Sequence, residues 1–189
     1  MAKTNLGAQG IVFPGAVLLI GTYDADGNPD VMNAAWGGQC GPKHIAMNLS
    51  PHKTTENLEL KKAFTIAFGT KETLVASDYV GMVSAKNEPD KVKKAGFTVT
   101  KGENADAPVI NEMPLTLECK VVSLGNDPAT NECRVVGEIM NVIADESVLT
   151  DGKVDFGKVS PILFDGVSAG YWSIGERVGN AFKDGTALK

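Results

Sequence analysis

The sequence is poor in the residues on which most metal sites and disulfide frameworks depend. It has 189 residues, of which two are histidines and three are cysteines. Zinc and di-iron sites need several clustered nitrogen or sulfur ligands, so we expect no structural metal. Cys40, Cys119 and Cys133 show no Cys-x-x-Cys spacing, and an odd number of cysteines is typical of free thiols in a reducing compartment. The cytoplasm is therefore the expected location.

Longer motifs are missing as well. The chain has neither the glycine-rich fingerprint of dinucleotide-binding folds nor a phosphate loop. Its formal net charge is -5 and its lysines are dispersed, which argues against a nucleic-acid-binding surface. The apolar stretch near the N-terminus is short and ends in a polar, turn-like segment. It predicts a strand, and neither a signal peptide nor a membrane-spanning segment.

The remaining composition predicts one globular domain. Hydrophobic residues make up 43% of the chain and charged residues 22%, which is the ordinary balance of a soluble protein. A chain of this length can bury a sizeable core. No internal repeat, low-complexity tract or linker interrupts the sequence, so we expect a single domain over residues 1–189, with a loosely ordered tail over residues 178–189.

Strand patterns dominate the chain. The strand candidates are residues 16–23, 29–36, 43–50, 63–70, 114–125 and 132–145. The first two flank Asp26 and Gly27, a pair that predicts a tight hairpin turn. The last two flank turn formers at residues 126–131, which predicts a second, longer hairpin. Hairpin connections favour an antiparallel sheet closed into a barrel over a doubly wound parallel sheet.

Short helices are expected between the strands. The helix candidates are residues 54–62, 71–84 and 87–97. The first has Thr54 or Thr55 as its expected N-cap, Glu56 in its first turn and lysines in its last, which suits the helix macrodipole. The third opens after Pro89 and ends at Gly96.

The strand end near residue 35 has features that suit a flat ligand. Ala34, Ala35, Gly37 and Gly38 would let such a molecule approach the backbone closely. Trp36 is able to flank it, although an isolated tryptophan is more often a core or interface residue.

The turn before the first predicted helix has features that suit a phosphate. Ser50, Lys53, Thr54 and Thr55 lie where unpaired N–H groups and the helix dipole attract anions. An ordinary N-cap beside an exposed lysine is the alternative interpretation. Together, the two half-sites fit a ligand with a planar ring at one end and a phosphate at the other.

Several longer segments occur in a characteristic order. They are PGAVLLIGTYDADGNPDVMNAAWGG, SPHKTTENL followed by AFTIAF, VSAKNEPDKVKKAGF, APVINEMPLTLECKVV, VVGEIMNVIADESVL and YWSIGERVG. In this order and spacing, from Pro14 to Phe182, the chain resembles the flavin reductase-like, FMN-binding split-barrel family, and within it the flavoredoxin branch. The resemblance implies a mainly β fold with short helical insertions, a six-stranded antiparallel split β-barrel, and a homodimer with one FMN per subunit near the interface.

The resemblance also implies cofactor-binding residues in three segments. The isoalloxazine ring would lie along Met32, Asn33, Ala34, Ala35 and Trp36. The ribityl chain and phosphate would be held by Asn48, Leu49, Ser50, Lys53, Thr54 and Thr55, with Asn57 nearby. Ser84 and Lys91 complete the set, in a segment where Ala85 replaces the glycine usual in the family. We expect no catalytic side chain, because the flavin itself carries the redox chemistry.

The resemblance leaves more than one function open. As a reductase, the protein would take hydride from NAD(P)H and pass electrons to a flavin, a metal complex or another acceptor. As a flavoredoxin, it would receive electrons from a protein donor of the ferredoxin type. A non-catalytic FMN- or small-molecule-binding protein with a storage or sensing role is the alternative, since a fold alone does not define a function.

Other conspicuous side chains receive simpler interpretations. Tyr171 and Trp172 are expected to pack at the subunit interface or over the flavin. His52 is expected to be exposed in a loop. Cys119 and Cys133 lie on the two strands of the longer hairpin, where they could face one another, and are interpreted as buried free thiols.

Overall fold

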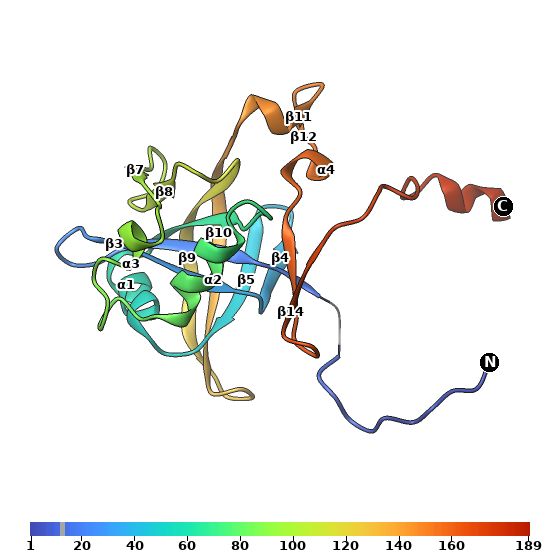
Figure 1. The fold of residues 1–189 in the computed structure, drawn as a ribbon, viewed down its shortest axis with the longest axis horizontal. Helices are drawn as coiled ribbons and strands as arrows, with labels where there is room; N and C mark the ends of the chain where they lie inside the picture. The colour runs from blue at the N-terminus through green and yellow to red at the C-terminus, as the bar shows by residue number, and fades with distance from the viewer. Residues whose placement is uncertain (12–13) are drawn as a thin grey trace.

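The computed structural model describes residues 1–11 and 14–189. In this part of the chain the main sheet has seven strands in the order β3-β2-β6-β9-β10-β5-β4, and every neighbouring pair is antiparallel. Its strands are β2 (Leu18–Tyr23), β3 (Pro29–Ala34), β4 (Gly37–Gly41), β5 (His44–Leu49), β6 (Ala63–Phe68), β9 (Leu115–Asp127) and β10 (Glu132–Ala144). The sheet curls round a core (Figure 1), and within the described residues its end strands β3 and β4 do not pair with each other.

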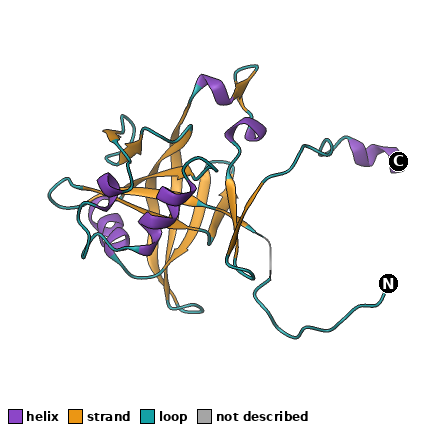
Figure 2. Cartoon of the chain, in the orientation of Figure 1, coloured by secondary structure: helices purple, strands orange, loops and turns teal. Residues whose placement is uncertain are grey.

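Smaller sheets and short helices surround this split barrel (Figure 2). The additional strands are β1 (Gly15–Ala16), β13 (Ile162–Asp165) and β14 (Gly170–Ser173) in one sheet, β7 (Val99–Lys101) with β8 (Pro108–Ile110), and β11 (Leu149–Thr150) with β12 (Lys153–Val154). The helices are α1 (Lys53–Lys61), α2 (Leu74–Met82), α3 (Lys91–Lys94) and α4 (Phe156–Val159), with 3-10 turns η1 (Glu146–Val148) and η2 (Asp184–Leu188).

The predicted mainly β, antiparallel split-barrel fold is confirmed. The main sheet has one strand more than the expected six, because Gly37 to Gly41 pair with β5 as the short strand β4. The predicted first hairpin joins β2 to β3. Asp24 closes its turn by accepting hydrogen bonds from the backbone N–H groups of Asp26 and Asn28, at 3.0 and 2.8 Å. Gly27 adopts a φ of 82° there, which glycine tolerates best.

The longer hairpin, β9 and β10, is also confirmed. Its register places Cys119 opposite Ile139 and Cys133 opposite Asn126, so the two thiols do not face one another. Cys119 is buried and free, as predicted. Burial raises the pKa of its thiol to about 12, which keeps it protonated at neutral pH.

The start of α1 differs from the sequence prediction. The N-cap is His52, not Thr54 or Thr55. The hydroxyl of Thr55 accepts a hydrogen bond from the His52 backbone N–H at 2.9 Å and donates one to the His52 carbonyl oxygen at 2.7 Å. Thr55 thus caps the turn from a position inside the helix. Residue preferences at the N-cap position do not predict this arrangement.

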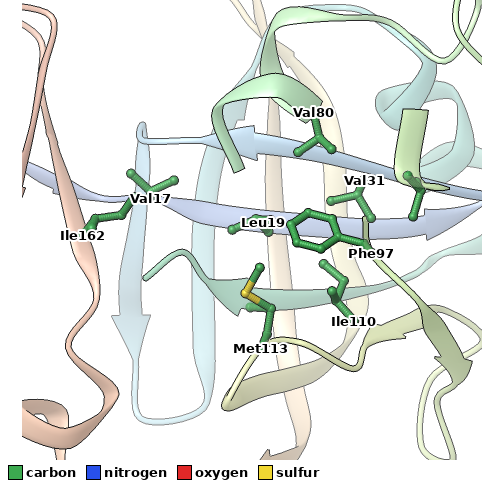
Figure 3. Packing of buried hydrophobic residues seen from close by; sticks show 10 residues of the cluster. Val17, Leu19, Val31, Val80, Phe97, Ile110, Met113 and Ile162 are labelled. Atoms are coloured by element: carbon green, nitrogen blue, oxygen red, sulfur yellow. The ribbon is translucent and has the colours of Figure 1, made fainter. Parts of the chain in front are cut away.

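The two largest clusters of the core lie one on each face of β2. Leu18 and Ile20 point to one side and pack with Phe64 and Ile66 of β6. The opposite face carries Leu19, which packs in a second cluster beneath α2. Figure 3 shows this cluster, with Val80 of α2 directed toward Val31 and Leu19 and with Phe97, Ile110 and Met113 close by. Burial on both faces explains why β2 begins as an apolar run without alternation.

Both ends of the chain extend away from the barrel (Figure 1). The C-terminal segment carries apolar side chains, among them Val178 and Phe182, that are fully open to solvent. Among the described residues, no helix combines the length and the apolar character needed to cross a bilayer.

Candidate functional site

A cavity of about 390 Å³ opens where β3 and β5 end beneath α2. Residues from both half-sites of the sequence prediction line it. Its lining residues are Val17, Met32, Asn33, Ala34, Ala35, Trp36, Asn48, Leu49, Ser50, His52, Asp78, Gly81, Met82, Glu132, Phe164 and Tyr171. The backbone joins the two strand ends, because the N–H of Asn48 donates to the carbonyl oxygen of Trp36 at 2.9 Å. The structure therefore brings Met32 to Trp36 and Asn48 to Ser50 into one site.

Small residues create the space along the β3 edge of the cavity. A Cβ atom added to Gly15 would lie 2.5 Å from the Ala35 carbonyl oxygen, so glycine is required where β1 passes this edge. Gly81 of α2 lies against the Asn33 side chain, and a Cβ atom there would collide with the amide group. Asn33 also donates from Nδ2 to the carbonyl oxygen of Ser77 at 2.9 Å. These contacts fix α2 across β3.

The opposite wall comes from the C-terminal third of the chain. The hydroxyl of Tyr171, on β14, donates to Asp78 Oδ1 of α2 at 2.6 Å and so links the two walls. Burial, together with this contact to a carboxylate, raises the pKa of Tyr171 to about 12. The ring packs at a tilt against Phe164 of β13, with centroids 5.9 Å apart. The structure places Tyr171 at the wall of the cavity.

His52 is at the α1 end of the cavity. Its imidazole is half-buried and lines the cavity, and its Nδ1 atom is buried without a hydrogen-bond partner. Burial lowers the pKa of His52 below its ordinary value of 6.5, although nearby Asp30 offsets part of the shift. The expectation of a solvent-exposed histidine is therefore wrong. The N–H groups of the first turn of α1 begin beside this ring, where a helix attracts anions.

The residues after His52 point elsewhere. Lys53 Nζ lies 3.8 Å from Asp24 Oδ2, and its side chain lines a second cavity of about 410 Å³ that includes Ala85, Lys86 and Lys93. The hydroxyl of Thr54 donates to Asp30 at 2.7 Å. Of the predicted phosphate half-site, Ser50 therefore lines the first cavity, whereas Lys53, Thr54 and Thr55 adjoin it at the start of α1 without lining it.

The other predicted contact residues lie behind the cavity or beside it. The buried amide of Asn57 donates to the hydroxyl of Thr22 at 3.0 Å. Ser84 is half-buried in the turn after α2, where its carbonyl oxygen accepts from the N–H of Glu88 at 2.9 Å. Lys91 is 3% exposed and pairs with Asp30. As contacts to a cofactor, these residues stay predictions.

Sequence reasoning missed several lining residues. Asp78, Gly81 and Met82 belong to a helix predicted only as an insertion, while Glu132 and Phe164 carry no motif. The hydroxyl of Ser50 donates to Glu132 at 3.4 Å, which explains why a carboxylate is tolerated at this wall. Among the described residues that line the cavity, the titratable side chains are Asp78, Glu132, His52 and Tyr171.

The arrangement suits binding more than acid–base chemistry. Asp78 is engaged by Tyr171 and Glu132 by Ser50. The part of the chain that the structure describes also contains no group of three His, Cys, Asp or Glu side chains able to hold a metal ion. What the cavity offers is a small-residue edge on β3, with the start of α1 next to it at His52.

Comparison with known proteins gives matches over most of the chain. Residues 10–165 match the model of the flavin reductase like domain. The flavoredoxin of Desulfovibrio vulgaris (Miyazaki F) is 37% identical, with 97% of this chain and 100% of that chain covered and a TM-score of 0.90. The flavoredoxin of Methanosarcina acetivorans is 30% identical, with 99% and 100% covered and a TM-score of 0.87.

A curated relative matches over a shorter region. An uncharacterised protein of Aeropyrum pernix is 26% identical over 128 residues, which are 66% of this chain and 48% of that protein. The chain therefore spans about half the length of the curated relative that it matches.

Proposed function

The chain belongs to the flavin reductase-like family, and from this premise we propose that it is an FMN-binding electron-transfer protein. It takes electrons from NAD(P)H or from a protein donor and passes them to a flavin, a metal complex or another acceptor. Two of its structural relatives are flavoredoxins, which supports the relay of electrons as the shared chemistry.

One observation carries this proposal: two separate segments that the sequence marks as ligand-binding line one cavity. The small-residue edge from Met32 to Trp36 and the turn from Asn48 to Ser50 meet there. The cavity volume of about 390 Å³ falls in the ordinary range of small-molecule sites.

The residues present fit a flavin. The isoalloxazine ring would lie along Met32 to Trp36, where Ala34 and Ala35 keep the backbone accessible. The buried Nδ1 atom of His52 lacks a partner, and leaving such a group unpaired is costly, so a polar ligand atom there would be favourable. The ribityl chain would pass Asn48, Leu49 and Ser50 toward the imidazole ring of His52.

The phosphate end would lie at the start of α1. The first-turn N–H groups of that helix supply donors, and Lys53 supplies charge from the adjoining cavity. Thr54 and Asn57 hold this turn to the barrel through their hydrogen bonds to Asp30 and Thr22, and Thr55 closes the turn on His52. Ser84 lies in the turn after α2, next to Ala85, which lines the same cavity as Lys53.

A bound flavin supplies the hydride and electron chemistry, so the chain need only bind, orient and shield it. Tyr171 and Asp78 close one wall with their hydrogen bond. Trp36, which is 62% exposed, flanks the entrance and leaves room for a donor. We further propose a homodimer, with the cavity near the interface.

The absorbance spectrum of the purified protein tests the proposal. We expect a yellow protein, or one that takes up added FMN, with flavin bands that bleach anaerobically when the true donor is added. Bleaching by NADH or NADPH supports a reductase, and bleaching by a reduced ferredoxin alone supports a protein-fed carrier. A colourless protein that does not take up FMN would overturn the proposal in either form.

A further inference from the structure

Two opposite charges are buried together behind the α1 end of the cavity. Asp30, in β3, is 2% exposed and Lys91, the first residue of α3, is 3% exposed. Lys91 Nζ lies 3.0 Å from Asp30 Oδ1. Removing two charges from water is costly, and attraction between them offsets the cost only when further hydrogen bonds satisfy the remaining atoms.

The remaining atoms of this pair bind two other elements. Lys91 Nζ donates to the carbonyl oxygens of Val80 and Val83, each at 3.1 Å, at the C-terminal end of α2. A cation is favourable there because the helix dipole is negative at that end. Asp30 Oδ2 accepts from the Thr54 hydroxyl at 2.7 Å, in the first turn of α1. Four elements, α1, α2, α3 and β3, therefore meet at one ion pair.

The elements that meet at this pair form walls of the proposed flavin site. Gly81 and Met82, which line the cavity, lie between the two carbonyl groups that Lys91 binds. His52, which also lines the cavity, is two residues before Thr54. Further along β3, Met32 begins the edge assigned to the ring. The ammonium group of Lys91 is itself enclosed by protein atoms.

We propose that Asp30 and Lys91 are positioning residues for the phosphate-bearing end of the flavin. They hold the first turn of α1 and the end of α2 at a fixed separation, and they act through Thr54 and the α2 carbonyl groups without touching the ligand. This inference rests on the proposed binding of FMN. In this inference Lys91 does not contact the cofactor; it holds in place the elements that do.

Comparison of FMN with riboflavin tests the inference, because riboflavin has the same ring and ribityl chain but no phosphate. Fluorescence titration gives the affinity of each variant for both molecules. The double variant Asp30→Asn with Lys91→Met removes both charges at once, which avoids leaving one buried charge unpaired. Thr54→Val removes only the hydroxyl that links α1 to Asp30.

Both variants should lose about tenfold in FMN affinity, the equivalent of one lost hydrogen bond to a charged group. Their riboflavin affinity should stay close to that of the wild type, so the preference for FMN shrinks. Glu118→Gln is the matched control, since Glu118 is a buried carboxylate that binds Asn104 and Asn141 away from the cavity. It should lower thermal stability and leave the FMN-to-riboflavin ratio unchanged.

The alternative is that the ion pair only stabilises the fold. In that case affinity for both flavins would fall together in the double variant, or neither affinity would change, and the inference would be overturned while FMN binding by the wild type stood. A wild-type protein that binds neither flavin would overturn the proposed function and this inference with it.

Discussion

Lys53 is the residue whose charge is best placed to serve a phosphate at the start of α1. Its ammonium group lies 3.8 Å from Asp24 and is partly exposed, and a surface pair of this kind contributes at most about 1 kcal/mol to stability. Lys53→Ala should therefore leave the unfolding free energy nearly unchanged and weaken FMN binding about tenfold, as expected for a lost charge-assisted contact. Isothermal titration with FMN measures the second effect.

Lys61 offers the matched control for Lys53. It lies at the other end of α1 and its ammonium group is 3.7 Å from Asp106, so Lys61→Ala removes a similar surface lysine far from the helix start. FMN affinity should be unaffected by this change. Equal FMN affinity in Lys53→Ala, Lys61→Ala and the wild type would show that Lys53 does not serve the phosphate.

His52 should make the stability of the ligand-free protein depend on pH. Its pKa in the folded protein is lowered, chiefly by burial, from an ordinary value of 6.5. The unfolded chain therefore binds a proton more readily, and the stabilising contribution is present above about pH 6.5 and is lost as the pH falls through the folded pKa. Urea unfolding between about pH 5 and pH 8 should show this loss in the wild type.

His52→Asn removes the titrating ring and provides the comparison. The loss of stability on acidification should become smaller in the variant, because the carboxylates that also titrate are unchanged. Identical pH dependence in the two proteins would contradict a lowered pKa at the half-buried His52.

At the scale of elements, the packing of α2 on β3 sets the width of the cavity. Gly81 has no room for a side chain, because Asn33 occupies the space where a Cβ atom would lie. Gly81→Ala should push the helix from the strand, cost about 1–3 kcal/mol as other overpacked sites do, and weaken FMN binding. Chemical denaturation and FMN titration measure the two effects.

Gly125→Ala is the control for this element. Nothing lies within 4 Å of a Cβ atom added at Gly125, in β9, so this change should alter neither stability nor FMN affinity appreciably. If Gly81→Ala matched the control in both measurements, the close contact of α2 with β3 would not control the site.

The elements that the sequence predicts well are those whose signals are local. The Asp-Gly turn of the first hairpin and the turn formers between β9 and β10 act over a few residues. The N-cap of α1 was misplaced because Thr55 stabilises the turn from inside the helix. The sequence does not reveal the contribution of Asp78 on α2, because the bond from Tyr171 to Asp78 joins residues 93 positions apart and no local pattern encodes such a contact.

The predicted site residues also divide into those with a local sequence signal and those whose position depends on distant contacts. Met32 to Trp36 and Asn48 to Ser50 line one cavity because each segment includes the end of its strand, β3 or β5. The direction of a side chain in a helix depends on the neighbours packed against it. The sequence therefore predicts that Lys53 and Lys91 lie near the site, but it does not predict which way their ammonium groups point. Lys91 is turned inward by the carboxylate of Asp30, which lies far from it in the chain.

At the scale of the whole molecule, exposed apolar side chains favour a second copy of the chain as a partner. Trp36 is 62% exposed and Trp172 is 58% exposed, and the C-terminal segment carries Phe182 fully open to solvent. Association surfaces are built from exposed large apolar groups of this kind. The proposed homodimer would cover such groups, and its particle mass would be twice 19.9 kDa.

Sedimentation velocity at several protein concentrations tests the dimer. Phe182→Ser and Trp172→Ser together should weaken association and shift the particle toward 19.9 kDa, because both remove apolar area that association would bury. Leu60→Ser is the control: it removes an exposed leucine on α1, so it should keep the wild-type mass. If FMN binds near the interface, added FMN should also favour the dimer by mass action. A wild-type particle of 19.9 kDa at every concentration, with or without FMN, would mean that the cavity functions within one chain.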